Sequence, residues 1–287
     1  MPSSPVRSRA LSSLPVRRCL PGALALGLLT GLAPGLAQAQ ASAFSRTAGE
    51  PVAAGTVWHY EKSNRDGSDA WHFAIYFASP SRVEVLKWLP GEDLVEVHAD
   101  LDLVRAMPVH MQQWNLVKGE RRPTLSADAA PKASRLKVHF AKGGSVELEG
   151  GTLPLHVWGF DLASLAPLLP LLRHPVQGFR LSMVDPNRQG RHGEPALVDE
   201  ARFEYLGRRE WQGRPTHQYR ITGPVFDGQA GLLVSSLQGQ LLHAEHPIPT
   251  STDWTDWRLS FTRAGQLNGN QWEQFKLELQ RQLAAGG

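Results

Sequence analysis

Residues 71–78 read WHFAIYFA, and the large apolar side chains of Trp71, Phe73, Ile75 and Phe77 occupy every second position. Successive side chains of a β-strand point to opposite faces of a sheet, so this period of two predicts a strand with one buried face. The same alternation recurs at 95–103, 179–183, 203–205, 217–221 and 257–261. Its recurrence predicts a mostly β fold whose sheet has one apolar face and one polar face.

Short glycine-containing segments separate the alternating stretches, as the turns of β-hairpins do. They are Asp66-Gly67, Pro90-Gly91, Gly143-Gly144, Gly207, Gly213 and Gln238-Gly239. Roughly ten strands joined by such turns predict a meander, and therefore a curved antiparallel sheet that forms a half-barrel. Residues 119–134 contain two arginines, two prolines and no periodicity, so they are expected to form a loop.

One or two helices are expected to cover the sheet. A short helix would begin at Asp161 as its N-cap and end before Pro167, because proline cannot continue a helix. A C-terminal helix would begin at Asn270 and carry one apolar stripe. The stripe consists of Trp272, Phe275, Leu279 and Leu283. We expect it to pack against the open side of the sheet, with a partner-docking face as the alternative.

The first 39 residues have the composition of a cleaved secretory signal peptide. Four arginines and no acids precede an apolar run at 23–36, and Ala37-Gln38-Ala39 offers the small residues of a cleavage site. We therefore expect a signal peptide at 1–39, a flexible tail at 40–54, and one antiparallel β domain with a C-terminal helix at 55–287. The expected location is the periplasm, and the mature chain would contain no cysteine, because Cys19 is the only one.

Charge argues against a nucleic-acid partner, and hydropathy argues against a membrane-spanning helix in the mature chain. The chain has 30 basic and 27 acidic residues, and four arginines lie in the predicted signal peptide, which leaves 26 against 27. Binding of nucleic acid normally requires a clear basic excess, so it is not expected. No later apolar stretch reaches the length of a membrane-spanning helix, and the mature protein is expected to be soluble.

The sequence contains no convincing catalytic or metal-binding motif. Ser134 and Lys137 have a Ser-x-x-Lys spacing, but side chains three apart on a strand point to opposite faces. His243 and Glu245 could share one strand face with His246 on the other, and we expect them to be surface residues. No catalytic residue, metal ligand or cofactor is therefore predicted.

Nine tryptophans are spread over the mature chain, and they have two possible roles. They can pack the core and the strand ends, or they can line an apolar cavity between the sheet and a covering helix. The candidate lining residues for a lipid-like or aromatic ligand are Trp71, Phe73, Ile75, Phe77, Phe179, Leu181, Met183, Trp257, Phe261 and Trp272.

The last third of the chain resembles a known group of proteins. The resemblance lies in the sequences at 203–207, 212–216, 219–223, 231–234 and 238–241, which combine alternating strands with turn glycines. They resemble uncharacterised periplasmic half-barrel proteins, which are similar in architecture to the lipoprotein carriers LolA and LolB. The resemblance implies an antiparallel sheet wrapped around helical cover, with an apolar concave face. No carrier-specific residue matches, so the carrier function does not transfer.

These observations predict an exported envelope protein that binds an apolar, lipid-like ligand or an envelope partner without catalysis. One alternative is a hydrolase acting on envelope glycans or esters, since paired acids such as Asp253 and Asp256 flank Trp254. Another alternative is a structural interaction protein. The three hypotheses share the fold and differ in what the apolar face contacts.

Overall fold

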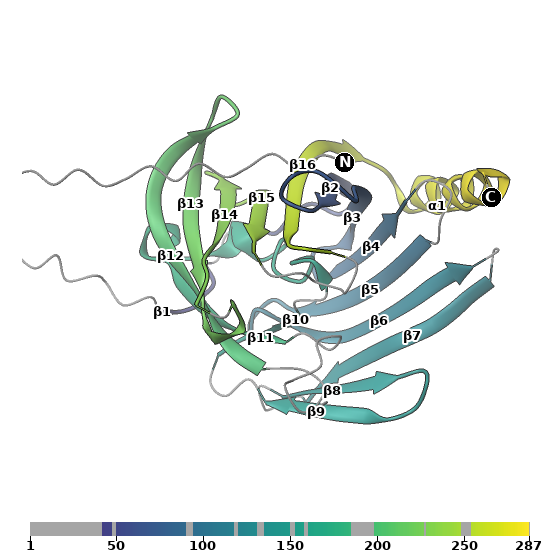
Figure 1. Ribbon diagram of the computed structural model, residues 1–287, viewed down its shortest axis with the longest axis horizontal. Helices are drawn as coiled ribbons and strands as arrows, with labels where there is room; N and C mark the ends of the chain where they lie inside the picture. Colours follow the sequence, from purple (N-terminus) through teal and green to yellow (C-terminus); the bar gives the residue numbers. More distant parts are fainter. Residues whose placement is uncertain are drawn as a thin grey trace, which may run out of the picture. The chain divides into compact units, whose positions relative to one another are not determined.

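Alternating apolar residues build one long antiparallel sheet in which most strands follow each other in chain order (Figure 1). Each strand from β2 to β9 pairs antiparallel with the next, and so does each strand from β11 to β16. β16 pairs antiparallel with β2 and joins the two runs into one sheet of 16 strands. β1 and β9 end this path, so the sheet stays open. The predicted curved antiparallel half-barrel is confirmed.

The computed structural model describes residues 42–47, 50–89, 94–117, 120–130, 135–149, 153–157, 160–184, 198–226, 228–247 and 254–286. All of them belong to the unit Ala39–Gly287. The predicted signal peptide, the Pro90-Gly91 turn, Ser134 and Asp253 lie outside the described residues.

The strands are β1 (Ser42–Ala43), β2 (Thr56–Ser63), β3 (Trp71–Ser79), β4 (Arg82–Trp88), β5 (Leu94–Asp102), β6 (Met107–Val117), β7 (Glu120–Ala129), β8 (Arg135–Phe140), β9 (Ser145–Glu149), β10 (Leu155–Val157), β11 (Phe179–Val184), β12 (Val198–Trp211), β13 (Arg214–Thr222), β14 (Gly231–Ser236), β15 (Leu241–His246) and β16 (Trp257–Gln266). The helices are α1 (Gly269–Gly286) and the short 3-10 turns η2 (Leu169–Leu171), η3 (Pro175–Gln177) and η4 (Pro224–Phe226).

Two strands depart from the antiparallel pattern. β1 and β10 both pair parallel with β11. β1 lies in the segment expected to be a flexible tail, and Phe44 directly after it is buried with its ring 5.4 Å from that of Phe179. Part of this tail therefore belongs to the core, which its many small residues did not indicate.

The loop expected at 119–134 is wrong over most of its length. Residues 120–129 form β7, which pairs with both β6 and β8. The register shifts between Gln113 and Trp114, where Pro123 pairs with Trp114. A β-bulge accepts a proline that a regular ladder would exclude, and exposed arginines hide the alternation of Leu125 and Ala127.

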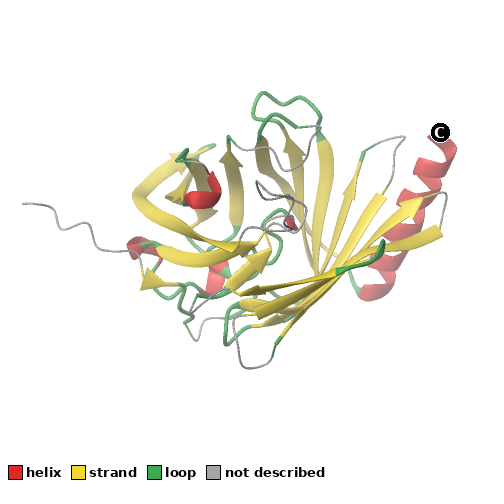
Figure 2. Ribbon diagram, turned by 60° about the horizontal axis from the view of Figure 1, so that its bottom comes forward, coloured by secondary structure: helices red, strands yellow, loops and turns green. Residues whose placement is uncertain are grey.

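The two faces of the sheet carry different clusters of apolar side chains. Phe73, Ile75 and Phe77 point into the main core, together with residues of nearly every other strand. Ala74 and Tyr76 point to the opposite face and pack under α1. Figure 2 shows α1 lying along the strands at one side of the sheet.

The main core is completed from within by residues 160–172, which we call the inner segment. The short helix expected from Asp161 to Ala166 is absent: residues 161–168 form successive turns, and η2 follows. Asp161 and Leu162 have φ angles of 52° and 59°, in the left-handed region, so Asp161 cannot act as an N-cap. Apolar residues of the inner segment fill the interior of the half-barrel.

The C-terminal helix is confirmed, with a different cap and on the face opposite the main core. Asn268, and not Asn270, accepts a hydrogen bond from Gln271 N at 2.9 Å, and Gln271 Oε1 accepts one from Asn268 N at 2.8 Å. This reciprocal pair is a capping box. Trp272 and Leu279 are buried on the side of the helix that faces the sheet, as the stripe predicts. Among the described residues, no helix combines the length and apolar character needed to cross a bilayer.

Replacing Gly239 by alanine is expected to destabilise the fold about 1 to 3 kcal/mol more than replacing Gly213 by alanine. Both glycines have positive φ angles, 86° and 74°, so both variants carry the same backbone cost. A Cβ atom at Gly239 would lie 2.5 Å from Cα of Pro170 in the inner segment, whereas Gly213 faces open space. Chemical denaturation measures the difference, and equal losses would contradict the packing of this turn against the inner segment.

Candidate functional site

The structure brings seven of the ten predicted ligand-binding residues together in the main core. Fully buried there are Phe73, Ile75, Phe77, Phe179, Leu181, Met183 and Trp257. Trp71 and Phe261 are partly exposed, and Phe261 packs against the same core. Trp272 belongs to α1 and packs on the other face of the sheet. The seven buried residues and Phe261 therefore share a core with the inner segment, and Trp272 does not.

The inner segment fills the interior of the half-barrel, where the sequence predicts an apolar cavity. Its leucines at 162, 165, 168 and 171 are each at most 1% exposed. Pro167 and Pro170 lack the backbone N–H that a regular helix would use, and most of its hydrogen bonds are local turns. The sequence shows this leucine-rich run interrupted by prolines, but it predicts a short covering helix that ends before Pro167 and gives no sign that the run fills the interior.

A buried ion cluster holds the start of the inner segment. The carboxylate of Asp161 is 1% exposed and pairs with Lys62 Nζ at 2.9 Å and with Lys87 Nζ. Its Oδ1 also accepts a hydrogen bond from Trp257 Nε1 at 3.0 Å, and the Lys62 ammonium lies 4.7 Å from the ring centre of Trp254. Burial alone would raise the pKa of Asp161, but the two lysines outweigh it and lower this pKa to about 2.

Sequence reasoning missed this cluster, although the strand phase contained a signal. Lys62 follows Trp58 and Tyr60 at the inward positions of β2, and Lys87 follows Val83 and Val85 at those of β4. A lysine at an inward position must either find a buried carboxylate or disrupt the core. The two in-phase lysines therefore point to an acid on a segment inside the half-barrel.

A second polar contact fastens the middle of the inner segment. His156 in β10 is fully buried, with Nδ1 3.1 Å from Ser164 Oγ and Nε2 2.8 Å from the carbonyl oxygen of Ala106. The carbonyl can only accept, so Nε2 carries the proton and Nδ1 accepts from the serine hydroxyl. Burial lowers the pKa of His156 to about 4, and the ring is neutral at pH 7.

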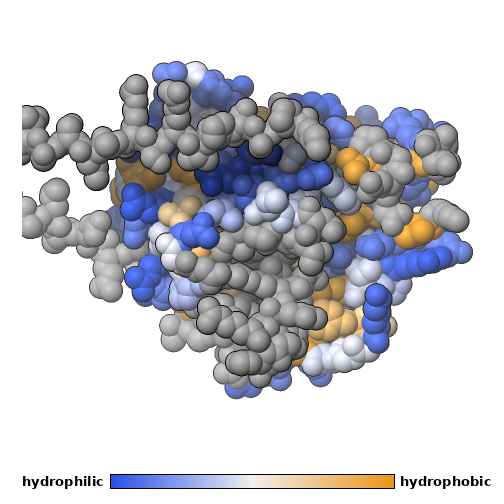
Figure 3. Space-filling model, in the orientation of Figure 1, coloured by the Kyte–Doolittle hydropathy of each residue, from blue (hydrophilic) through white to orange (hydrophobic). Residues whose placement is uncertain are grey.

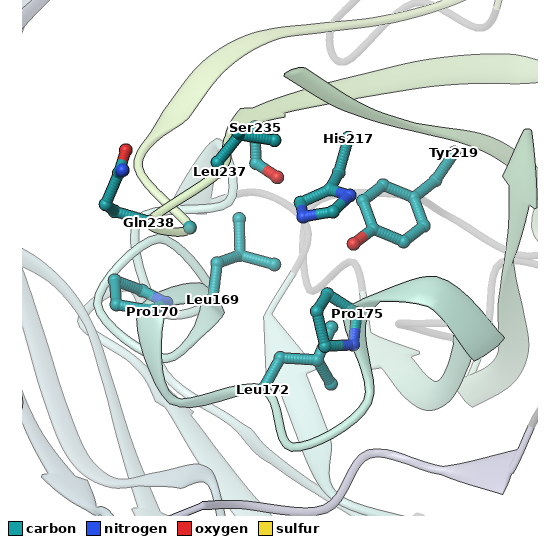
Figure 4. A pocket seen from close by; sticks show the side chains of 10 residues that line it. Leu169, Pro170, Leu172, Pro175, His217, Tyr219, Ser235, Leu237 and Gln238 are labelled. Carbon is teal, nitrogen blue, oxygen red and sulfur yellow. The ribbon is translucent and has the colours of Figure 1, made fainter. Parts of the chain in front are cut away.

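A cavity of about 90 Å³ lies where the end of the inner segment meets β13 and β14 (Figure 4). One wall is apolar and comes from η2 and the chain that follows it, including Leu169, Leu172 and Pro175. The facing wall presents the side chains of His217, Tyr219 and Ser235. The cavity is thus amphipathic, with apolar groups on the inner segment and hydrogen-bonding groups on the sheet.

The hydrogen-bonding wall of this cavity carries no charge at neutral pH. Burial, and then the nearby charge of Arg208, lower the pKa of His217. Burial raises the pKa of Tyr219 well above its ordinary value. His217 Nδ1 lies 3.2 Å from the hydroxyl of Tyr205, so the wall is a set of neutral donors and acceptors.

On the outer face of β15 and β16, the side chains of a serine, a histidine and a glutamate form a chain of contacts, with the histidine in the middle. His243 Nδ1 lies 3.0 Å from Ser260 Oγ, and His243 Nε2 lies 3.4 Å from Glu245 Oε2. The expected surface position of His243 is wrong, because its side chain is buried and the ring of Trp211 lies over it at 4.6 Å. The expected sharing of one strand face by His243 and Glu245 is correct.

This arrangement lacks a feature that acyl-transfer catalysis requires. Ser260 lies in a strand that pairs on both sides, with β15 and with β2. The ladders use the backbone N–H groups that would otherwise form an oxyanion hole at this serine. The three side chains are best explained as a hydrogen-bond chain that keeps a buried histidine satisfied.

Under α1, Glu84, Glu96 and His98 place ligand atoms within 4.8 Å of one another, as a metal site would. Lys276 Nζ already lies 3.3 Å from Glu96 and 3.4 Å from Glu84. Burial opposes ionisation of Glu96, but a hydrogen bond from His98 and the charges of Lys276 and Arg121 lower its pKa to about 2. The lysine ammonium thus takes the cation's place and ties α1 to the sheet.

The comparisons with known proteins concern the fold. No protein-family model and no curated protein matches the sequence. One similar solved structure is a beta-barrel-like protein of the domain of unknown function DUF1849 from Brucella abortus, with 7% identity and a TM-score of 0.47. The match covers 76% of this chain and 100% of that one.

A second similar structure is a putative outer membrane lipoprotein-sorting protein domain from Vibrio parahaemolyticus, with 8% identity and a TM-score of 0.21. The match covers 79% of this chain and 91% of that one.

Proposed function

We propose that this protein binds an apolar ligand with an uncharged hydrogen-bonding group, and that the ligand enters the half-barrel at the cavity beside η2. The observation that carries the proposal is the cavity's two-sided chemistry. Leu169, Leu172 and Pro175 can contact a hydrocarbon chain, while His217, Tyr219 and Ser235 can bond a polar group. Apolar residues of the inner segment fill the neighbouring interior.

The neutral wall favours a ligand with an uncharged polar group. His217 has a lowered pKa and Tyr219 a raised one, so neither supplies a charge to balance a carboxylate or an ammonium. Burying an unbalanced ligand charge there would be costly. Hydroxyl and imidazole groups bond well to carbonyl and hydroxyl oxygens. An acyl ester, an acyl amide or a long-chain alcohol therefore fits this wall better than a free fatty acid does.

A cavity of about 90 Å³ is smaller than a lipid chain, so the end of the inner segment must move when the ligand enters. Two backbone hydrogen bonds tie this end to the chain after β1: Thr47 N to Leu171 O at 2.8 Å, and Arg173 N to Ser45 O at 2.9 Å. Leucine contacts would be exchanged for ligand contacts of similar apolar character, so the exchange requires little loss of buried apolar area. Asp161, held by its lysines, keeps the start of the segment in place.

The proposed location of this activity is the periplasm, as an envelope protein. The proposal rests on the sequence of residues 1–39, with its basic start, apolar run and small-residue cleavage site. An apolar molecule crossing an aqueous compartment needs a protein that shields it, and a half-barrel with an exchangeable filling provides such a shield.

Saturable binding of N-phenyl-1-naphthylamine, a neutral apolar fluorophore, is expected for the full chain after export and purification. Ser235→Leu should weaken this binding at least tenfold, because the leucine side chain fills a cavity of about 90 Å³. Fluorescence titration measures both affinities. Native mass spectrometry of the same samples is expected to find a co-purified acyl compound on the unmodified protein only.

Ser81→Leu is the matched control, since Ser81 is exposed in the turn between β3 and β4. Its affinity for the fluorophore should equal that of the unmodified protein. The proposal is wrong if the unmodified protein shows no saturable binding, or if Ser235→Leu binds as well as Ser81→Leu does. Melting curves establish that both variants are folded before the titrations are compared.

A further inference from the structure

We infer that the end of the β12–β13 hairpin docks onto a membrane surface rich in anionic phospholipid. This inference goes beyond the ligand proposed for the interior and does not depend on it. It rests on an arginine cluster consisting of Arg208, Arg209 and Arg214, with Trp211 between them in the chain. We call these four residues the hairpin cluster.

The hairpin extends beyond its neighbours in the sheet. β12 and β13 pair with each other as far as Trp211 and Arg214, whereas β13 pairs with β14 only from Thr216 onward. In Figure 1 the β12–β13 hairpin accordingly rises past the ends of β14 and β15. Figure 3 shows hydrophilic residues over this end of the hairpin. The ring of Trp211 lies back over His243 of β15, whereas the three arginines are exposed at the end of the hairpin. A flat surface can therefore approach the arginines.

The arginines of the hairpin cluster differ from those lower on the same strands. Arg202 pairs with Glu200 at 2.6 Å, and Arg220 lies 3.9 Å from Glu204. Within the described part of the chain, no carboxylate pairs with any of the three cluster arginines. All three are exposed. The sequence between residues 205 and 230 contains only two acids, Glu210 and Asp227.

Strand register places the cluster on both faces of the hairpin. Trp211 pairs with Arg214, and Arg209 pairs with Thr216, so these residues share one face. Arg208 pairs with His217 and lies on the other face. Guanidinium groups that diverge in this way cannot converge on one small anion. They can bind separate phosphates of an extended surface that lies across the hairpin end.

The chemistry of the cluster favours a lipid surface over other anionic partners. Guanidinium groups bind phosphodiesters through two parallel hydrogen bonds, and phosphodiesters are the anionic groups that a phospholipid surface presents. A shallow notch of about 260 Å³ at the surface of the hairpin is lined by Arg208, Arg209, Glu210, Gly213 and Pro215, and it gives room for one headgroup. Three arginines in a nearly neutral chain provide too few contacts for a nucleic-acid site.

Co-sedimentation of the full chain with phospholipid vesicles tests the inference. Vesicles of equal parts phosphatidylglycerol and phosphatidylcholine should bind the protein, and vesicles of phosphatidylcholine alone should not. Raising the sodium chloride concentration to half-molar should release it. The triple variant Arg208→Gln, Arg209→Gln, Arg214→Gln should lose at least tenfold in affinity, with its melting temperature unchanged because all three residues are exposed.

The matched control removes three exposed arginines that do have carboxylate partners: Arg122→Gln, Arg202→Gln, Arg220→Gln. It carries the same change in net charge and should bind like the unmodified protein. Three outcomes overturn the inference: equal binding to both kinds of vesicle, equal losses in the two triple variants, and competition by millimolar inorganic phosphate. The last outcome would identify a site for a free phosphate in place of a membrane surface.

Discussion

Asp161→Ala is expected to lower the free energy of unfolding by about 3 to 5 kcal/mol, because it removes the buried carboxylate that pairs with the partly buried Lys62 and the buried Lys87. Lys62 and Lys87 are 14% and 9% exposed, so water can do little to compensate for the loss. The alanine also leaves Trp257 Nε1 without the acceptor that it now has at 3.0 Å. Urea denaturation measures the effect.

Asp100→Ala is the control, because Asp100 pairs with Arg82 at the surface, and such pairs contribute about 1 kcal/mol or less. The triple variant Lys62→Met, Lys87→Met, Asp161→Asn removes the charges together and should recover most of the lost stability. Asparagine is chosen since it tolerates the left-handed conformation of residue 161. A mild effect of Asp161→Ala would mean that the cluster is hydrated and does not hold the inner segment.

The pH dependence of this cluster follows from the pKa of Asp161, which folding lowers from 3.8 to about 2. A carboxylate with a lowered folded-state pKa contributes its full stabilisation above the unfolded value. That contribution is present above about pH 4 and is lost as the pH falls toward 2. The triple methionine–asparagine variant should lack this part of the acid destabilisation.

Most strands could be predicted because one face of the sheet packs against the main core, while much of the other face carries polar side chains. Phe73, Ile75 and Phe77 face the main core, so their spacing shows directly in the sequence. β7 escaped prediction because its outward residues are charged and Pro123 sits at a bulge. Register irregularities of this kind depend on the partner strand, and the sequence of one strand does not contain them.

The site was less predictable than the sheet, because it depends on what fills the half-barrel. The apolar residues of β3, β11 and β16 were expected to face a cavity, whereas residues 160–172 pack against them. A leucine run interrupted by prolines is compatible with the end of a helix and with a series of turns. The buried ion pairs of Asp161 hold residue 161 inside the half-barrel, and they depend on lysines that lie far away in the sequence. The sequence also does not reveal which face of the sheet each element covers. Both α1 and the inner segment carry apolar residues, so only the packing of the whole fold assigns them to opposite faces.

The largest stability effect on the other face of the sheet is expected at Trp272. Its indole stacks on Tyr76 with ring centres 4.7 Å apart, is 1% exposed, and donates a hydrogen bond to Glu84 Oε2 at 2.8 Å. Truncating a buried tryptophan to alanine costs about 3 to 5 kcal/mol, which is a large part of the stability of a domain. Trp272→Ala should therefore lower the melting temperature sharply.

Two leucines of α1 provide the matched comparison for this helix. Leu279 is 6% exposed and faces the sheet, while Leu277 is 47% exposed on the outer side of the same helix. Leu279→Ala should cost about 2 to 5 kcal/mol, and Leu277→Ala less than about 1 kcal/mol, although the chemical change is identical. If α1 were a docking helix held away from the sheet, melting temperatures would be unchanged for Trp272→Ala and Leu279→Ala alike. Unequal losses at the two leucines, together with a large loss at Trp272, require that α1 covers β2 to β6 in solution.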